Sequence, residues 1–428
     1  MSYKKKVLII TYYWPPAGGS GVQRWLKFSK YLRDFEIEPV IYTIDNPSYP
    51  ILDKSLESEI PKDLEILKQA IFEPNSMLSF FGRNNKKESA GFLNPNPTFF
   101  GSIIQYIRAN YFIPDARKFW IQPSVNFLSN YLENNHIDAI ITTGPPHSMH
   151  LIGLELKKKL GIKWISDFRD PWTEIDYFQQ LPLTKKATKK HQDLEQEVLI
   201  NSDMVVVVGE TMKDKFLKHT NRIEVLTNGF DTIEDLSTQK LDEKFSITHV
   251  GLMNSDRNPT ILWEVLNEIS NTNLNFKNDL RIKLIGKIDD AVIQDLKVFD
   301  HNTIETIPYL DHKDVGKYQA SSQILLLSIN EVPSAKGIIT GKIFEYLQAK
   351  RPILAIGPED GDAAMILKNT NAGTIVGFKN KTALKATILN LYKDYKEGVL
   401  FVKSVNIEQY HRKNITSQLA EVIKKVVS

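Results

Sequence analysis

The sequence predicts an α/β protein made of two doubly wound parallel sheets, one in each half of the chain. Short, continuous runs of β-branched and aliphatic residues recur along the sequence, which is typical of parallel strands that helices cover on both faces. Amphipathic stretches lie between several of these runs, and this alternation is the order of an α/β fold. The pattern restarts after a polar segment in the middle of the chain, which indicates a second domain.

The first half begins with an apolar run that we expect to form the first strand of its sheet. Amphipathic stretches at 23–32 and 149–160 are expected to be helices, because their apolar residues recur at helical spacing. We place the first domain at 1–230. Its expected strands are Val7–Ile10, Pro39–Thr43, Ala139–Thr142, Lys163–Ser166, Met204–Val208 and Ile223–Leu226.

The second half starts after 231–244, a polar segment without a strong hydrophobic period that we predict to be a linker. We place the second domain at 245–405. A last amphipathic helix lies within 406–428, and its pattern alone assigns it to neither domain. The expected strands of the second domain are Ile247–Val250, Arg281–Ile285, Ile304–Thr306, Ile324–Leu327, Ile353–Ala355 and Gly373–Val376.

Composition excludes several classes of protein. The chain has 428 residues, no cysteine and a formal net charge of +3. Without cysteine there is no disulfide scaffold, thiolate metal site or cysteine nucleophile. A charge this close to zero argues against a nucleic-acid partner, because nucleic-acid-binding domains are usually strongly basic.

Membrane and targeting signals are weak. No stretch reaches the roughly 18 uninterrupted apolar residues of a spanning helix, and no signal-peptide cleavage pattern follows the first strand. We therefore expect a cytoplasmic protein. The basic and aromatic region 80–120 leaves a peripheral contact with the inner membrane open, although we favour an aromatic helix face at 99–112 packed on the domain. Its aromatics are Phe80, Phe81, Phe92, Phe99, Phe100, Tyr106, Tyr111, Phe112, Phe119 and Trp120.

Three segments of the first domain combine charge, histidine or glycine at the ends of expected strands. A glycine loop, Gly18, Gly19, Ser20 and Gly21, joins the first strand to a helix and either receives an anion on its backbone amides or only makes a tight turn. His147 follows the third strand and is either a ligand contact or a polar surface group. Asp167, Arg169 and Asp170 follow the fourth strand and either pair with one another or share a cleft with the loop.

The second domain offers an anion site. Gly251 ends a strand and Arg257 begins the next helical segment. Further along, a glycine- and lysine-rich loop opens a helix, so that amides, the helix dipole and ammonium groups converge on one anion. Glu345, one turn into that helix, is placed to accept hydrogen bonds from paired sugar hydroxyls. The residues of this loop are Lys336, Gly337, Thr340, Gly341 and Lys342.

Taken in order, these motifs resemble those of the glycosyltransferase family 4-like group, which has the GT-B fold. The resemblance covers nearly the whole chain. Each motif is modest alone, but their order and spacing are specific. They are Pro-Pro-Ala-Gly-Gly-Ser-Gly-Val-Gln-Arg (15–24), Gly-Pro-Pro-His-Ser-Met-His-Leu-Ile-Gly (144–153), Asp-Phe-Arg-Asp-Pro-Trp (167–172), Asn-Gly-Phe-Asp (228–231), Gly-Lys-Ile-Phe-Glu-Tyr-Leu (341–347) and Arg-Pro-Ile-Leu-Ala-Ile-Gly-Pro (351–358).

The resemblance implies two Rossmann-like domains facing across a cleft, with the C-terminal helix crossing back to the first. It also implies transfer of a sugar from a nucleotide-diphosphate donor, UDP- or GDP-linked, to a glycan or lipid-linked acceptor in surface-polysaccharide assembly. Glu345 would hold the ribose, and Gly341, Lys342 and Arg257 would surround the diphosphate. His147, Asp167, Arg169 and Asp170 would be catalytic on the acceptor side. Such enzymes are similar to retaining transferases that use no metal and no cofactor, because positive side chains and helix amides stabilise the departing diphosphate.

Two departures from the family pattern keep alternatives open. Gly337 stands where the family has the first glutamate of a pair, and Leu252 stands where it commonly has an arginine, for which Lys336 could compensate. A nucleotide-sugar 2-epimerase shares the architecture, as does a phosphorylase, although no pyridoxal lysine can be singled out. A non-catalytic carbohydrate-binding assembly protein with a degenerate site is the third alternative.

Overall fold

A computed structural model describes residues 4–47, 49, 51–71, 99–175, 178, 180–231, 239–308, 310 and 312–428. Within these residues the chain divides into two compact units. Unit 1 comprises residues 1–228 together with 412–428, and unit 2 comprises residues 229–411. Residues 232–238, inside the predicted linker, lie outside the described part of the chain.

Unit 1 is built around a seven-stranded parallel sheet with the order β3-β2-β1-β4-β5-β6-β7. Its strands are β1 Lys5–Ile10, β2 Ile37–Ile44, β3 Glu65–Gln69, β4 Ala139–Gly144, β5 Lys163–Phe168, β6 Met204–Val207 and β7 Ile223–Val225. Its helices are α1 Ser20–Tyr31, α3 Phe99–Tyr111, α4 Ile121–Asn134, α5 Ser148–Leu160, α6 Lys185–Asn201, α7 Glu210–Phe216 and α15 Arg412–Val427.

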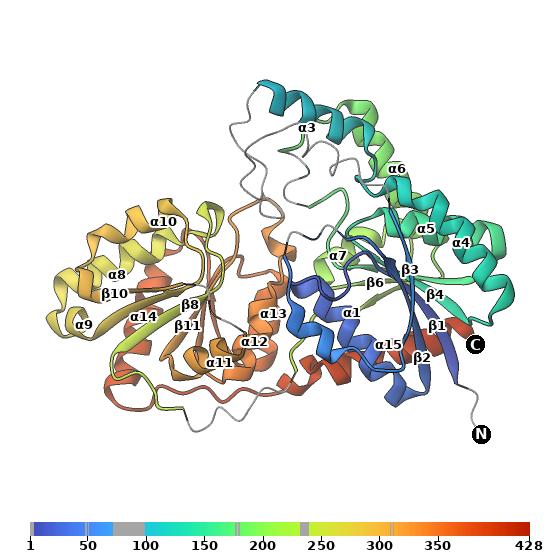
Figure 1. Cartoon of the computed structure of the whole chain (residues 1–428). Helices are drawn as coiled ribbons and strands as arrows, with labels where there is room; N and C mark the ends of the chain where they lie inside the picture. Colours follow the sequence, from blue (N-terminus) through green and yellow to red (C-terminus); the bar gives the residue numbers. More distant parts are fainter. Residues whose placement is uncertain are drawn as a thin grey trace. The chain divides into compact units, whose positions relative to one another are not determined.

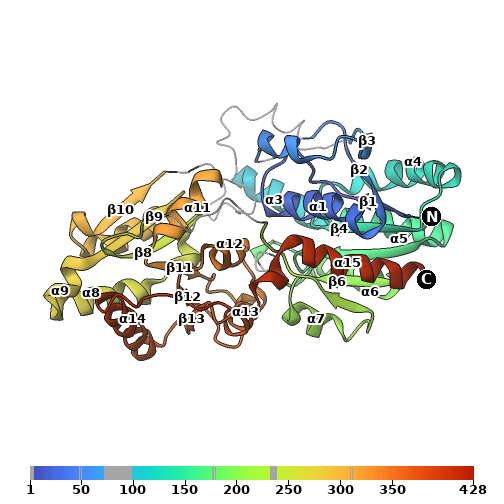
Figure 2. The same ribbon diagram turned by 90° about the horizontal axis from the view of Figure 1, so that it is seen from below.

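The sheet of unit 1 has a hydrophobic core on each face. Leu8 and Ile10 of β1 pack in one core with α4 and α5, whereas Val7 and Ile9 pack in the other with α1 and α15. Because successive side chains of a strand point to opposite faces, a strand covered on both sides must be apolar throughout. This geometry explains the continuous apolar runs and confirms that the C-terminal helix returns to the first domain, where α15 lies beside α1 (Figures 1 and 2).

Unit 2 contains a six-stranded parallel sheet with the order β10-β9-β8-β11-β12-β13. Its strands are β8 Phe245–Val250, β9 Leu280–Ile285, β10 Ile304–Ile307, β11 Ile324–Ser328, β12 Ile353–Ile356 and β13 Gly373–Val376. Its helices are α8 Thr260–Thr272, α9 Leu274–Asp279, α10 Asp290–Asp295, α11 His312–Ser321, α12 Gly341–Ala349, α13 Asp362–Thr370 and α14 Lys381–Lys396. The two doubly wound sheets confirm the predicted fold class.

Candidate functional site

Each sheet has one point at which its strand order reverses, and the predicted site residues follow strands at these points. The reversal lies between β1 and β4 in unit 1 and between β8 and β11 in unit 2. At such a point the connections leaving the carboxyl ends of the strands diverge, which leaves room for a ligand. The glycine loop follows β1, and Gly251 follows β8. Each unit therefore has one edge that topology favours for binding.

The glycine loop of unit 1 joins β1 to α1 in a conformation that side chains would obstruct. The amide of Gly18 donates to the carbonyl of Ile51 over 3.0 Å, and a Cβ on Gly18 would lie 2.9 Å from the Ile51 side chain. Gly19 has φ +102°, a region that only glycine adopts readily. Ser20 begins α1, whose first turn carries no acidic residue. The loop therefore presents a helix N-terminus that is compatible with an anion.

Gly21 is the contact point between the glycine loop and the segment after β5. A Cβ on Gly21 would lie 1.7 Å from Nη1 of Arg169, so the guanidinium occupies the space that the glycine leaves. Arg169 also donates to the carbonyl of Pro145, and burial lowers its pKa. Asp170 is exposed. The structure thus brings Gly21, Arg169 and Asp170 together at the carboxyl edge of this sheet.

Asp167 is buried and hydrogen-bonded within unit 1 and does not face solvent. It forms a buried ion pair with Arg24 over 2.9 Å, and it accepts further hydrogen bonds from Trp25 Nε1 at 2.7 Å and Thr143 Oγ1 at 2.8 Å. Its side chain is 1% exposed. A carboxylate this buried and this fully hydrogen-bonded has no surface to offer a substrate, so the catalytic role expected for Asp167 does not fit its position. Instead, it positions Arg24.

Arg24 also forms hydrogen bonds with the last residues of the main segment of unit 1. Its guanidinium donates to the carbonyls of Leu226 and Thr227 over 2.9 Å and 2.8 Å, immediately before the chain passes into unit 2. Sequence reasoning included Arg24 in a motif without giving it a role. A sequence signal for the role of Arg24 is an arginine on the apolar face of a predicted helix, because such an arginine is expected to be buried and to need an acidic partner.

His147 lies where β4 passes into α5 and is 7% exposed. Its ring stacks on Trp172 with centroids 4.7 Å apart and planes 3° apart. Burial, with the nearby His150 and Arg169, holds the pKa of His147 well below its usual value, so the ring is neutral at pH 7. Its Nδ1 is buried without a hydrogen-bond partner in the described part of the chain. A neutral imidazole can accept a proton or a hydrogen bond from a ligand.

His150 is a second buried histidine, and it belongs to the motif at 144–153 without a role predicted from the sequence. Trp164 Nε1 donates to the hydroxyl of Thr142, and the same hydroxyl shares a hydrogen bond with Nδ1 of His150 over 2.9 Å. Burial lowers the pKa of His150 to about 3. Nε2 of this ring would be 2.6 Å from a Cβ on Gly144. This contact explains why residue 144 is glycine.

Asp115 is another residue that the sequence did not single out. Its carboxylate accepts from the backbone N–H of Ser148 at 2.9 Å and from the Ser148 hydroxyl at 2.8 Å. It thereby caps α5 from a distant segment and stabilises the helix N-terminus. Because the cap lies 33 residues away in sequence, no local pattern could reveal it.

Unit 2 gathers two cationic side chains above the end of β8. Lys342 Nζ would lie 3.0 Å from a Cβ on Gly251, and Gly251 has φ +102°. Both Lys342 Nζ and Arg257 Nη1 donate to the carbonyl of Leu252, over 3.5 Å and 3.2 Å, while Arg257 Nε donates to Asn330. Burial and the charge of Arg257 lower the pKa of Lys342 to about 7. Two like charges held this close favour an anionic ligand.

The N-terminus of α12 adds uncompensated donors to this cationic cluster. Thr340 is its N-cap residue, yet its side chain makes no capping hydrogen bond, and the first turn contains no acidic residue. The Thr340 hydroxyl is buried without a partner in the described residues. Gly341 is the first residue of the helix. Free amides, the helix dipole and Lys342 together therefore form an anion-binding edge.

The remaining predicted residues of unit 2 have local partners. Glu345, in the same helix, accepts from Gln319 Nε2 over 3.2 Å, and its negative charge opposes the lowering of the pKa of Lys342 by burial and Arg257. Lys336 forms an exposed ion pair with Asp360 over 2.5 Å. Gly337 ends the short 3₁₀ helix Ala335–Gly337. The structure thus connects Glu345 to the cationic cluster and gives Lys336 a carboxylate partner.

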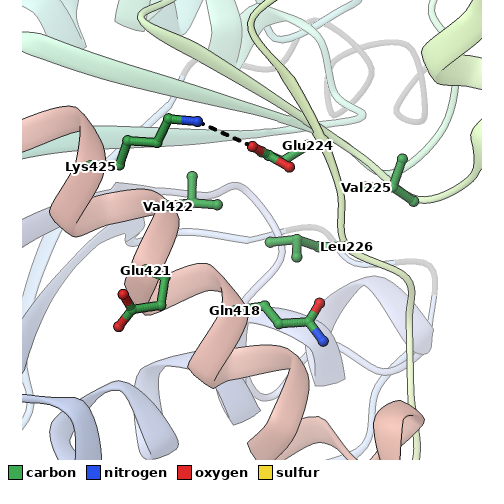
Figure 3. A pocket seen from close by; sticks show the side chains of 7 residues that line it. All are labelled: Glu224, Val225, Leu226, Gln418, Glu421, Val422 and Lys425. Carbon is green, nitrogen blue, oxygen red and sulfur yellow. Dashed lines mark hydrogen bonds and ion pairs between the residues drawn. The ribbon is translucent and has the colours of Figure 1, made fainter.

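A shallow groove of about 310 Å³ lies between β7 and α15 (Figure 3). Across it, Lys425 and Glu224 form an ion pair over 3.5 Å. None of the predicted site residues lines it. Its lining is Glu224, Val225, Leu226, Gln418, Glu421, Val422 and Lys425.

In the described part of the chain, no group of three or more histidine or acidic side chains has the arrangement of a metal site. No helix there is long and apolar enough to cross a membrane. Metal independence and the peripheral contact with a membrane both stay predictions.

Neither a family model nor a curated protein matches the sequence, but solved structures are similar to this one over almost their full length. TarM matches with a TM-score of 0.61 at 14% identity, covering 98% of both chains. HepE of Anabaena, solved in complex with UDP-glucose, matches at 0.59 and 12% identity, covering 98% of this chain and 99% of its own. A Listeria monocytogenes protein proposed as a UDP-N-acetylglucosamine 2-epimerase matches at 0.56 and 12% identity, covering 99% and 96%. Identities this low speak for the fold alone, and the chain has the GT-B fold.

Proposed function

We propose that this protein is a glycosyltransferase that moves a sugar from a nucleotide-diphosphate donor to a glycan or lipid-linked acceptor in cell-surface polysaccharide biosynthesis. The observation that carries the proposal is the anion-binding edge of unit 2. There, Lys342 and Arg257 share the carbonyl of Leu252 beside a helix N-terminus without an acid. A diphosphate supplies the negative charge that this arrangement lacks.

In this proposal the residues of unit 2 hold the donor. Lys342 and Arg257 bind the diphosphate, and the amides at Thr340 and Gly341 donate to its oxygens. Gly251 leaves room for Lys342 beside the end of β8, since any side chain there would collide with the lysine. Glu345 exchanges its hydrogen bond from Gln319 for one from the ribose.

Catalysis follows from stabilising the charge that develops on the leaving diphosphate. Buried cations and helix amides are preorganised for such a charge and need no metal to neutralise it. On this basis we propose a metal-independent reaction without a cofactor, with retention of the anomeric configuration. Lys336 would contribute only after leaving Asp360, which makes it a secondary contact.

The edge of unit 1 is the proposed acceptor side. The glycine loop and Arg169 provide an electropositive edge, and the neutral His147 can accept a hydrogen bond from an acceptor hydroxyl. Asp170, which is exposed, is the carboxylate that can approach a substrate. Asp167 supports this edge through Arg24 and takes no direct part.

A transfer assay tests the proposal. Purified protein is incubated with UDP- and GDP-linked sugars and a membrane or glycan acceptor fraction, and labelled sugar in the acceptor is measured. We expect the wild-type protein to transfer sugar and both Lys342→Ala and Glu345→Ala to reduce this transfer. The anomeric configuration of the product is determined by NMR. Interconversion of the donor without an acceptor would instead favour the 2-epimerase alternative, to which one similar structure is assigned. If both variants kept donor binding and turnover at the wild-type level, the proposed site would be wrong.

A further inference from the structure

The helix α3 has its apolar stripe directed outward. Ile103, Ile104 and Ile107 are 42%, 42% and 43% exposed, and Tyr111 is 66% exposed, whereas Ala109 on the opposite side is buried. The exposed residues are spaced by three, four and seven positions and so share one face of the helix. The aromatic helix face expected to pack on the domain at 99–112 is not packed at Tyr106 and Tyr111, which are 43% and 66% exposed, and the side chains of Phe99 and Phe100 lie outside the described part of the structure. An exposed apolar stripe of this kind indicates a contact surface.

The neighbouring helix α6 begins with an uncompensated group of lysines. Lys185, Lys186, Lys189 and Lys190 are all exposed, and the first turn contains no acidic residue. Positive charges at a helix N-terminus oppose the helix dipole, and like charges four residues apart repel each other. Within the described chain only Lys189 among the four forms an ion pair, with Asp193 over 2.9 Å. An arrangement that costs helix stability is explained if an anionic partner binds it.

The two features belong to one surface of unit 1. Asn110, near the end of α3, donates to the carbonyl of Pro182 over 2.8 Å and accepts from the amide of Thr184 over 2.7 Å. Thr184 is the N-cap residue of α6, so the end of α3 is joined to the start of α6, and the two helices lie side by side (Figure 1). Lys118, which donates to the carbonyl of Tyr111, lies close enough to Lys190 for the two charges to interact.

We propose that this surface docks on a bilayer that contains anionic lipids. The isoleucines and Tyr111 would enter the interfacial region while the lysines contact the headgroups, which is the combination that holds interfacial helices on membranes. The sequence of α3 contains no acid, and none occurs from 180 to 192, so neither α3 nor the first two turns of α6 carries a negative side chain. Phe80, Phe81 and Phe92 lie outside the described residues and carry no part of the inference. The docking surface is Ile103, Ile104, Ile107, Tyr111, Lys185, Lys186, Lys189 and Lys190.

The role of this docking surface in reaching a lipid-linked acceptor rests on the proposed function. Membrane docking itself is tested without measuring catalysis. Full-length protein is mixed with phosphatidylcholine vesicles, with or without phosphatidylglycerol, and floated through a density gradient. Two double variants, Lys186→Glu/Lys190→Glu and Ile103→Ser/Ile107→Ser, are compared with the charge-matched control Lys62→Glu/Lys218→Glu. The apolar control is Leu274→Ser/Val298→Ser, at residues that are 71% and 58% exposed in unit 2. Circular dichroism melts verify that every variant is folded.

We expect the wild-type protein to float with the anionic vesicles, and to do so less as salt concentration rises. The lysine variant should lose at least about tenfold in partitioning, since each basic residue at an anionic surface contributes appreciably. The isoleucine variant should lose a similar amount, and both controls should bind like wild type. Failure of the wild type to float, or equal losses in the controls, would overturn the proposal and favour a protein partner. Flotation without any binding of nucleotide sugars would refute the proposed function and leave the docking surface standing.

Discussion

Donor binding should depend on pH through Lys342. The pKa of this ammonium is lowered to about 7 by burial and by Arg257, so in the free protein it is about half protonated at neutral pH. A bound diphosphate stabilises the charged form and raises that pKa, so binding takes up a proton whenever the pH exceeds about 7. Affinity should therefore fall about tenfold per pH unit above about pH 7, until the pH reaches the pKa of the bound state.

Isothermal titration calorimetry with UDP or GDP checks this relation. Titrations between about pH 7 and about pH 9, in buffers of different ionisation enthalpy, should show uptake approaching one proton per ligand at the alkaline end. Lys342→Ala should lose about 10–100-fold in affinity at pH 7, the equivalent of a charge-assisted hydrogen bond, and its remaining binding should lack this pH dependence. Lys342→Arg stays charged over the whole range and should show the same flat profile with greater affinity.

A matched control uses Lys336, which is exposed and paired with Asp360. Lys336→Ala removes the same charge from the same unit and should change affinity less than about threefold, because an exposed ion pair contributes little. If wild-type affinity is independent of pH over this range, or if Lys336→Ala and Lys342→Ala lose affinity equally, the assignment of the diphosphate to Lys342 is refuted.

Three further substitutions test other parts of the account. Asp167→Ala leaves Arg24 as an uncompensated buried charge and should lower the free energy of unfolding by about 3–5 kcal/mol, measured by urea denaturation; an unchanged midpoint would contradict its structural role. Gly21→Ala places a methyl group against the Arg169 guanidinium, 1.7 Å from Nη1, and should reduce transfer at least about tenfold while calorimetry finds unaltered donor affinity. Glu345→Ala should weaken UDP or GDP binding about tenfold, the loss of one hydrogen bond to a charged acceptor, and should change the binding of inorganic diphosphate less, through the effect of Glu345 on the pKa of Lys342 alone.

The sequence predicts the central strands of both sheets well because both faces of these strands are largely buried. The strand that it misses, β3, lies at the edge of its sheet, and its residues Glu65–Gln69 are exposed or only half-buried. Such a strand is held by pairing with β2 instead of by a continuous apolar run. This edge strand therefore leaves a weaker signal in the sequence than the central strands do, although the sequence does predict the other edge strands, β7, β10 and β13.

The sequence also places the site residues near strand ends but cannot assign their partners. Charged residues after β5 indicate a functional edge, yet only the structure distinguishes the buried Asp167 from the exposed Asp170. The partner of Asp167 is Arg24, which lies 143 residues earlier, and no local spacing encodes that contact. In the same way, the periodicity of α3 predicts a helix face, but the direction in which that face points depends on tertiary packing.

Ligand-induced stabilisation tests the central claim most directly. A panel of UDP- and GDP-linked sugars is added to the wild-type protein and to Lys342→Ala, and the unfolding temperature of each is measured. Since a ligand that binds only the folded state stabilises it by mass action, we predict that at least one nucleotide sugar raises the unfolding temperature of the wild type and has little effect on the variant. If no nucleotide sugar stabilises the wild type, or if the variant is stabilised to the same extent, the anion-binding edge of unit 2 is not the donor site.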